Sequence, residues 1–321
     1  MKIRMFADTK NLLLKAQKGK YAVAHFNINN MEIVQGVVAA AAKLKSPIIL
    51  AASEGALKYA GMDYLYAIAK TAAEKSNIPI ALHLDHGKDM KIIKQAIQKG
   101  YSSVMIDASH EEFEKNIRIT KQVAALAHKR GISVEAELGT IGGAEDLVSS
   151  RKIIYTDPAK AKEFVERTGC DFLAVAIGTS HGAYKFQENA QGEVQGKISL
   201  GQGTLRHDIL QQIKQEVNVP LVLHGASGVP QGLVRMAEKY GADFSGVKGV
   251  PDAQIKKAIK YGITKINTDT DLRIAFDAAV RKTLHSKPKD FDPRQILAPA
   301  RDLIQEVAEQ RIKLFGSANK S

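Results

Sequence analysis

The sequence predicts an α/β protein, a (β/α)8 TIM barrel with extra N-terminal and C-terminal helices. Three observations support this prediction. Short apolar runs alternate eight times with longer amphipathic runs, as in a series of strand–helix units. The length of 321 residues suits one such barrel. Almost every apolar run ends in polar residues, and in a closed barrel all these ends meet on one rim.

An open, doubly wound sheet is the alternative architecture, but it would spread the polar strand ends along an edge. No GxGxxG motif follows the first apolar run, so a dinucleotide-binding fold is not indicated. The polar strand ends therefore favour the barrel.

The expected elements follow one another in order. The strand-like runs are 21–28, 47–53, 79–86, 103–109, 133–139, 171–178, 220–227 and 263–270. The helix-like runs between them include 31–45, 63–76, 88–100, 111–131, 157–169 and 251–262. Several of these helices end in glycine, as Gly100 and Gly169 illustrate, and Asp157-Pro158 has the form of an N-cap followed by proline at the first helical position.

Three segments lie outside the repeat. The first twenty residues predict an amphipathic helix, because they lack the continuous apolar stretch of a signal peptide. The polar stretch 187–203 predicts a loop or short insertion. Residues 290–321 predict a C-terminal helical extension that could pack on a neighbouring subunit. We find no domain boundary, so residues 1–321 are expected to form a single barrel domain.

Composition narrows the class of protein. The net charge is +12, but the lysines are scattered as on solvated helix faces, and no nucleic-acid-binding motif occurs. We therefore expect small phosphorylated anions, rather than nucleic acid, as primary partners. The sequence has no run of eighteen apolar residues, the length needed to span a membrane. The single cysteine, Cys170, cannot form an internal disulfide, which suits a cytoplasmic protein.

Three histidines stand at or just beyond expected strand ends: His86, His181 and His224. Neutral imidazoles suit Zn²⁺, and three protein ligands with one open position are typical of a catalytic zinc site. Strand alternation would place His83 and Asp85 on one face and His86 on the other, so His86 must lie where alternation relaxes. Asp85 could then move a proton on a substrate hydroxyl, or merely orient a histidine.

Three stretches combine small residues, free backbone N–H groups and hydroxyls at strand ends: SHGAYK (180–185), HGASG (224–228) and NTDTD (267–271). Such turns bind phosphate in barrels. Ser227 and Thr270 are the hydroxyl donors we select, and Lys185 could add charge. Phosphate sites around a metal indicate a phosphorylated carbonyl substrate, since a metal stabilises negative charge on a carbonyl oxygen.

The sequence resembles the class II, zinc-dependent fructose-1,6-bisphosphate aldolases and their close relatives, the tagatose-1,6-bisphosphate aldolases. The resemblance covers almost the whole chain in order. It rests on LHLDHG (82–87), EAELGTIGG (135–143) with Glu145 and Asp146, VAIGTSHGAYK (175–185), LVLHGASG (221–228), KINTDTDLR (265–273), FDPR (291–294) and FGSANK (315–320).

The resemblance implies a lyase that reversibly cleaves fructose 1,6-bisphosphate to dihydroxyacetone phosphate and glyceraldehyde 3-phosphate in glycolysis and gluconeogenesis. Asp85 would deprotonate the C4 hydroxyl, and Glu145, in a mobile loop, would exchange the proton at the dihydroxyacetone-phosphate carbon. The implied zinc ligands are His86, His181 and His224, with Glu137 and Asp107 at positions that contact zinc in an alternative resting location.

The resemblance also implies how the two phosphates are held. Arg273 would meet the far phosphate, while Asp292 and Arg294 would reach the active site of a neighbouring subunit in a homodimer or homotetramer. A monovalent cation, Na⁺ or K⁺, is expected near Gly182 and Gly225. The residues expected around the dihydroxyacetone-phosphate end are Gly182, Gly225, Ser227, Asn267, Asp269 and Thr270.

Alternatives remain at this point. Tagatose 1,6-bisphosphate differs from the fructose compound only in configuration at C4. Lys265, in phase with Asn267 on the eighth strand, could instead be the amine of a Schiff-base aldolase. A non-catalytic RNA-binding or scaffold protein would show salt-dependent nucleic-acid affinity. Asp269 and Asp271 could simply cap the helix that follows them.

Overall fold

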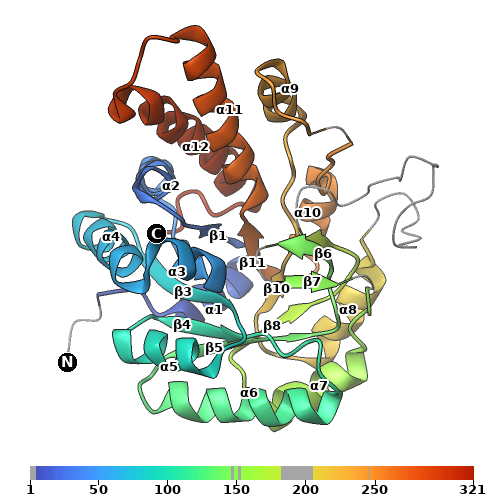
Figure 1. Ribbon diagram of the computed structural model, residues 1–321. Coiled ribbons are helices and arrows are strands. Elements are labelled where there is room, and N and C mark those ends of the chain that lie inside the picture. Colours follow the sequence, from blue (N-terminus) through green and yellow to red (C-terminus); the bar gives the residue numbers. More distant parts are fainter. Residues whose placement is uncertain (1–4, 146–147, 151–152, 182–204, 245) are drawn as a thin grey trace.

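The computed structural model describes residues 5–145, 148–150, 153–181, 205–244 and 246–321. Its centre is a closed barrel of parallel strands surrounded by helices (Figure 1). The last barrel strand pairs with the first, so the predicted (β/α)8 barrel is confirmed. In order around the barrel the strands are β1 (Val23–Asn27), β2 (Ile48–Ser53), β3 (Ile80–Gly87), β4 (Ser103–Ile106), β5 (Ser133–Leu138), β8 (Phe172–Val175), β10 (Leu221–Leu223) and β11 (Ile263–Thr268).

The expected helices and their caps are present. Gly100 and Gly169 end α5 and α7 in the left-handed conformation, and the Asp157 side chain accepts a hydrogen bond from the backbone N–H of Lys160 at 3.0 Å. The helices are α1 (Thr9–Gly19), α2 (Met31–Lys43), α3 (Glu54–Ala60), α4 (Met62–Lys75), α5 (Met90–Lys99), α6 (Phe113–His128), α7 (Pro158–Thr168), α8 (His207–Glu216), α9 (Gln231–Lys239), α10 (Asp252–Lys260), α11 (Thr270–Ser286) and α12 (Pro293–Phe315). The helical runs named from the sequence do not include α3, α8 or α9. The seven-residue α3 repeats its apolar spacing too few times to be recognised.

Helix α1 closes the amino-terminal end of the barrel. Leu13 on its inner face packs with Phe172 and other apolar side chains that the strands point inward. Burying a leucine or phenylalanine completely contributes roughly 1.5–3 kcal/mol to stability. This end of the barrel is therefore apolar, and the polar inward side chains gather nearer the carboxyl ends of the strands, namely His25, His83, Asp85, Glu135, Glu137, Lys265 and Asn267.

A second, small sheet accompanies the barrel. Strand β6 (Gly142–Glu145) pairs with β7 (Val148–Ser150) and with β9 (Ser180–His181), and Gly143 lies opposite His181. The backbone at Glu145 therefore forms a strand, and the expectation of a loop there is wrong. Two adjacent glycines precede Glu145 and present no side-chain alternation, so the strand leaves no period in the sequence.

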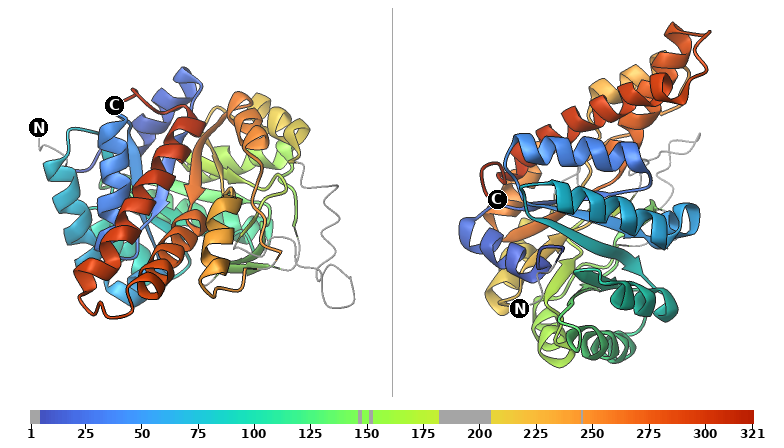
Figure 2. Two further views of the ribbon diagram at one scale, coloured as in Figure 1. Left: turned by 90° about the horizontal axis from the view of Figure 1, so that it is seen from above. Right: turned by 90° about the vertical axis from the view of Figure 1, so that its left-hand side faces the viewer.

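The C-terminal extension is helical, as predicted. Helix α12 begins at Pro293, with Asp292 as its N-cap, and packs against α11 and α2. Lys43 of α2 forms an ion pair with Glu309 of α12 at 2.8 Å. Helices α11 and α12 form a hairpin that projects beyond the barrel (Figure 2). Among the described residues, no helix is both long and apolar enough to cross a bilayer.

Candidate active site

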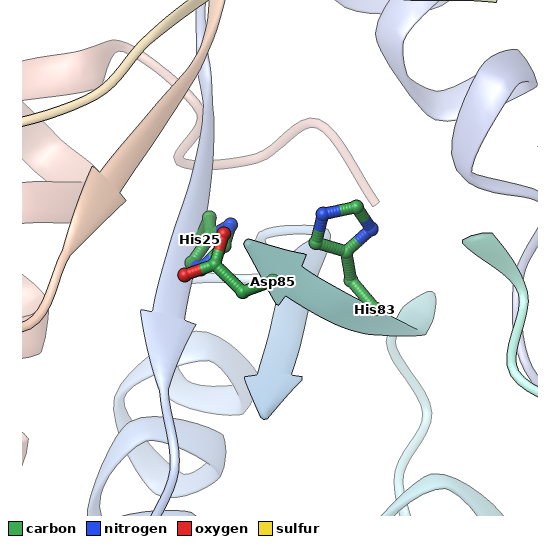
Figure 3. A group of neighbouring side chains, drawn as sticks. All are labelled: His25, His83 and Asp85. Carbon is green, nitrogen blue, oxygen red and sulfur yellow. The ribbon is translucent and has the colours of Figure 1, made fainter. Parts of the chain in front are cut away.

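Asp85 lies inside the barrel on β3 and is 3% exposed. Its Oδ2 accepts a hydrogen bond from Asn27 Nδ2 at 2.9 Å, and its Oδ1 accepts one from Asn267 Nδ2 at 3.1 Å. Figure 3 shows Asp85 beside His25, with His83 on the same strand. The ligand atoms of these three residues lie within 4.8 Å of one another, so the predicted shared face of His83 and Asp85 is confirmed. Two amide groups on different strands fix the orientation of the carboxylate.

His86 leaves the strand alternation, as expected for a side chain that must reach the rim. Its φ of 47° lies in the left-handed region, and the pairing of β3 with β4 shifts register between Leu84 and Gly87. His86 Nδ1 lies 2.8 Å from Asp107 Oδ2. Ser109 Oγ donates to the other oxygen of Asp107 at 2.8 Å. The bulge thus brings His86 to the same place as Asp85 and Asp107.

His224 follows directly after β10 and is completely buried. Its Nδ1 lies 2.9 Å from Glu137 Oε2 and its Nε2 lies 2.7 Å from Glu135 Oε1. Burial lowers the pKa of His224, but the hydrogen bonds to the two glutamates raise it more, so the net shift is upward. The ring centroids of His224 and His86 are 4.6 Å apart.

The surroundings of His86 favour a positive charge. Burial lowers the pKa of His86, but the negative charge of Asp85 and the hydrogen bond that His86 donates to Asp107 outweigh it and raise this pKa to about 10. The ligand atoms of Asp85, His86 and His224 lie within 4.8 Å of one another, as do those of His86, Asp107 and Glu137. Carboxylates and imidazoles at this spacing are suitable ligands for a divalent cation.

His25, His83 and Asp85 form a third group with metal-ligand spacing, deeper in the barrel. Burial, and then the positive charge of Lys265, hold the pKa of His25 well below its usual value and lower that of His83 to about 3. An ammonium that disfavours a proton on these rings also disfavours a metal ion. The group at the rim is therefore the better candidate metal site.

Two predicted residues lie on the small sheet. His181 does not end the sixth barrel strand, which stops at Val175, but lies six residues further on in β9. Glu145 lies on the neighbouring strand β6. The backbones of these segments are therefore adjacent, while the side chains of His181 and Glu145, like Gly182 and Lys185, lie outside the described part of the structure.

The expected phosphate residues flank the start of α11. Asp271, in the first turn of this helix, accepts hydrogen bonds from the backbone N–H groups of Gly228 at 3.2 Å and Val229 at 2.7 Å. These contacts fasten the HGASG turn to the helix N-terminus, where Thr270 stands. Ser227 and Thr270 are both buried. Aligned N–H groups at a helix N-terminus are a favourable environment for an anion.

Arg273 and Asp269 form a bidentate ion pair, with Nε–Oδ1 and Nη2–Oδ2 distances of 2.9 Å and 2.7 Å. Asp269 occupies the N-cap position of α11 but its side chain makes no cap hydrogen bond, so the simple capping interpretation is wrong for this residue. Arg273 also lines a cavity of about 370 Å³ together with residues such as Asn29 and Tyr59. An arginine beside an open cavity is a suitable phosphate ligand.

The alternative role of Lys265 receives no support from its position. Lys265 is completely buried on β11, its Nζ lies 2.9 Å from Glu135 Oε2, and it donates to Asn267 Oδ1 at 2.8 Å. An amine that forms an imine with a ketone must reach the substrate and be neutral. An ion pair in the closed interior of the barrel opposes both requirements.

With this geometry established, comparison with known proteins decides the family. The model of a family described as class II fructose-bisphosphate aldolase matches residues 7–320. The chain belongs to the class II fructose-bisphosphate aldolases. This is a family of metal-dependent lyases, and the His and Asp side chains at the rim form the candidate metal site of this aldolase.

Individual relatives support this assignment. The chain is 49% identical over 310 residues to a fructose-bisphosphate aldolase of Giardia intestinalis, covering 96% of this chain and 92% of the relative. It is 48% identical over 319 residues to one of Thermus caldophilus, covering 99% and 100%. Among solved structures, the YdjI aldolase of Escherichia coli K12 superposes with a TM-score of 0.77 at 36% identity, covering 98% of this chain and 99% of the other.

Sequence reasoning named no role for Asn27 and Glu135 and only a helix-capping role for Asp271, although all three hold the site of this class II aldolase. Asn27 and Glu135 could have been found, since each is two positions from another inward-facing residue, His25 and Glu137 respectively. Asp271 gave no such signal, because its partners are more than forty residues away in the chain.

Gly225, next to His224, is expected not to tolerate a side chain. Its φ is +60°, and a Cβ there would lie 2.6 Å from the backbone oxygen of Ser180 in β9. Gly225→Ala should therefore separate the HGASG turn from β9, lower the free energy of unfolding by roughly 1–3 kcal/mol and reduce aldolase activity, as measured by denaturant unfolding and a cleavage assay.

Gly232→Ala is the matched control, because a Cβ at this position in α9 meets no atom within 4 Å. It should leave activity unchanged and stabilise the fold by about 0.5–1 kcal/mol. A Gly225→Ala protein that is as stable and as active as the control would refute the close approach of this turn to β9.

Proposed function

We propose that the protein catalyses the reversible aldol cleavage of fructose 1,6-bisphosphate to dihydroxyacetone phosphate and glyceraldehyde 3-phosphate. The observation that carries the proposal is the Asp85 carboxylate, held by two amides and standing beside His86 and His224. A carboxylate fixed next to a candidate metal site is suited to act as an acid–base group, which supports the proposal. The sequence relationship to fructose-bisphosphate aldolases supports the choice of reaction.

We infer that Zn²⁺ is the metal and that His86, His181 and His224 hold it. The donor chemistry fits, since imidazole nitrogens suit zinc and the neighbouring buried carboxylates favour a cation. Glu137 and Asp107, which contact His224 and His86 respectively, are suitable for an alternative resting position of the ion. Bound zinc would act as a Lewis acid on the substrate carbonyl oxygen, in place of an imine.

Asp85 is the group we assign to the proton of the C4 hydroxyl. Burial raises the pKa of Asp85, but its electrostatic interactions with His25, His86 and Lys265 lower it well below its usual value. The carboxylate is therefore ionised and ready to accept the proton. As it does so, the C3–C4 bond breaks, its electron pair stays with the dihydroxyacetone-phosphate half, and the C4 oxygen becomes the aldehyde. In condensation Asp85 returns this proton to the aldehyde oxygen.

Glu145 is assigned to the second proton transfer. After the aldehyde has left, the carbon that carried the broken bond must gain a proton to yield dihydroxyacetone phosphate. Glu145 would deliver it, and would remove it in the reverse direction. The pairing of β6 with β9, which brings the backbone of Glu145 next to the segment that carries His181, supports this assignment.

The phosphate at the dihydroxyacetone end is assigned to the turns around the start of α11. Supporting features are the buried hydroxyls of Ser227 and Thr270 and the N–H groups of the helix N-terminus. A monovalent cation, Na⁺ or K⁺, near Gly182 and Gly225 would offset phosphate charge. Arg273, beside its cavity, is assigned to the far phosphate. The remaining residues proposed for the dihydroxyacetone-phosphate site are Gly182, Lys185, Gly225, Asn267 and Asp269.

We propose that the protein works as a homodimer or homotetramer in the cytoplasm. The projecting hairpin of α11 and α12 supports the oligomer, because Phe291 at its tip is 92% exposed. Asp292 and Arg294, also at the tip, contact each other at 2.7 Å and are proposed to reach the active site of a neighbouring subunit. The buried, unpaired thiol of Cys170 suits a reducing compartment.

The substrate assignment is tested by cleavage assays on fructose 1,6-bisphosphate and tagatose 1,6-bisphosphate. We expect the higher kcat/KM on the fructose compound, with triose phosphates formed in equal amounts. A higher kcat/KM on the tagatose compound would keep the metal chemistry and reassign the substrate. No cleavage of either sugar would refute the proposed reaction.

A further inference from the structure

Lys265 is a completely buried charged group that the proposed reaction does not use. Its side chain is one of the largest completely buried side chains in the described part of the structure. A lysine is seldom fully buried, because removing an ammonium from water is costly unless other groups compensate its charge. The groups that contact Lys265 therefore indicate what this position contributes.

The first contact leads to Asp85. Lys265 Nζ donates to Asn267 Oδ1 at 2.8 Å, and Asn267 Nδ2 donates to Asp85 Oδ1 at 3.1 Å. An ammonium can only donate hydrogen bonds. The oxygen of the Asn267 amide must therefore face Lys265, and the amide nitrogen is left to face Asp85. Lys265 thus determines that Asn267 presents a donor, not an acceptor, to the carboxylate.

The second contact leads to His224. Lys265 Nζ donates to Glu135 Oε1 at 3.2 Å and lies 2.9 Å from Glu135 Oε2. Glu135 Oε1 lies 2.7 Å from His224 Nε2. A carboxylate held in this way accepts the Nε2 proton, so the other ring nitrogen, Nδ1, which lies 2.9 Å from Glu137 Oε2, is the one that would bind a cation. Both branches are buried, so water does not replace any of these partners.

We propose that Lys265 is a positioning residue that couples the acid–base group Asp85 to the metal ligand His224. The inference rests on the proposed function. One ammonium orients Asn267 toward Asp85 and Glu135 toward His224, so the acid–base group and the metal site share one anchor. Lys265 touches neither substrate nor metal in this account.

The test compares three proteins: wild type, Glu135→Gln, and Glu135→Gln with Lys265→Met. Glu135→Gln serves as the background because Lys265→Met alone would leave a buried carboxylate without its cation. The oxygen of the introduced glutamine can still accept from His224. Against this background, Lys265→Met should weaken zinc binding, measured by chelator competition without substrate, by roughly 10–100-fold. At saturating zinc it should also lower kcat about tenfold or more, a larger change than in KM for fructose 1,6-bisphosphate.

A matched control removes an ion pair outside the barrel, with Lys43→Met and Glu309→Gln on α2 and α12. It should change neither zinc affinity nor kcat. If the folded Lys265 variant matches Glu135→Gln in both measurements, the inference is overturned. If the wild type itself neither binds zinc nor cleaves the sugar, it is the proposed function that fails.

Asn267→Ala provides a test that does not require the Lys265 variant to fold. It removes only the branch to Asp85, so kcat should fall while zinc affinity stays at the wild-type value. A loss of zinc affinity as large as the loss of kcat would contradict two separate branches and overturn the inference.

Discussion

His224→Ala should leave a folded protein without bound zinc and without measurable aldolase activity. His224 stands between Glu135 and Glu137 and is one of two described histidines at the rim metal site. A Lewis acid contributes several kcal/mol to the transition state, so its loss should lower kcat/KM by roughly 10³-fold or more. Zinc content by mass spectrometry and the cleavage rate check the two effects.

The control for His224 is His285→Ala, on the exposed side of α11. It should keep zinc content and activity at wild-type values. His224→Ala leaves two glutamates without their shared partner, so its circular dichroism must first show that the barrel persists. A folded His224→Ala protein with one zinc per chain would contradict the ligand assignment.

Asp85→Asn should keep zinc but lower kcat by roughly 10²–10⁴-fold, the usual contribution of a positioned acid–base group. Asparagine preserves the shape of the side chain, and its oxygen can still accept one hydrogen bond from Asn27 or Asn267. It cannot take the proton of the C4 hydroxyl. Single-turnover cleavage together with zinc analysis separates the loss of the base from the loss of metal.

This experiment also distinguishes an acid–base role of Asp85 from a role as a metal ligand. The second role is an alternative because an Asp85 oxygen lies within 4.8 Å of the ligand atoms of His86 and His224. Loss of zinc from Asp85→Asn would make Asp85 a metal ligand and leave the base unassigned. Asp171→Asn is the matched control. Asp171 is also buried, but it accepts from the backbone N–H of Val134 and pairs with Lys10 on α1, away from the rim.

Much of the fold could be predicted from the sequence because each barrel strand is a compact apolar run with a polar end. The sequence also predicted that His86 leaves the strand alternation, because regular alternation would have turned its side chain away from Asp85. The small sheet could not, because Gly142 and Gly143 carry no side chains that alternate. Its strands are also only two to four residues long.

The site was predictable as a set of strand ends, but not as a network. Chemical type and position identified Asp85, His86 and His224. Lys265 is linked through Asn267 to Asp85, and Asn267 and Asp85 are 182 positions apart in the chain. No local sequence pattern encodes such a link. Asp271 illustrates the same limit, since a residue that resembles a helix cap instead binds a turn more than forty positions earlier.

We propose that one metal ion at the rim, beside Asp85, makes this barrel an aldolase. The most direct test is to remove metal with a chelator and titrate zinc back while measuring cleavage of fructose 1,6-bisphosphate. Activity should be absent from the metal-free protein, rise linearly with added zinc and level off at one zinc per chain. Full cleavage by the metal-free protein would contradict the account.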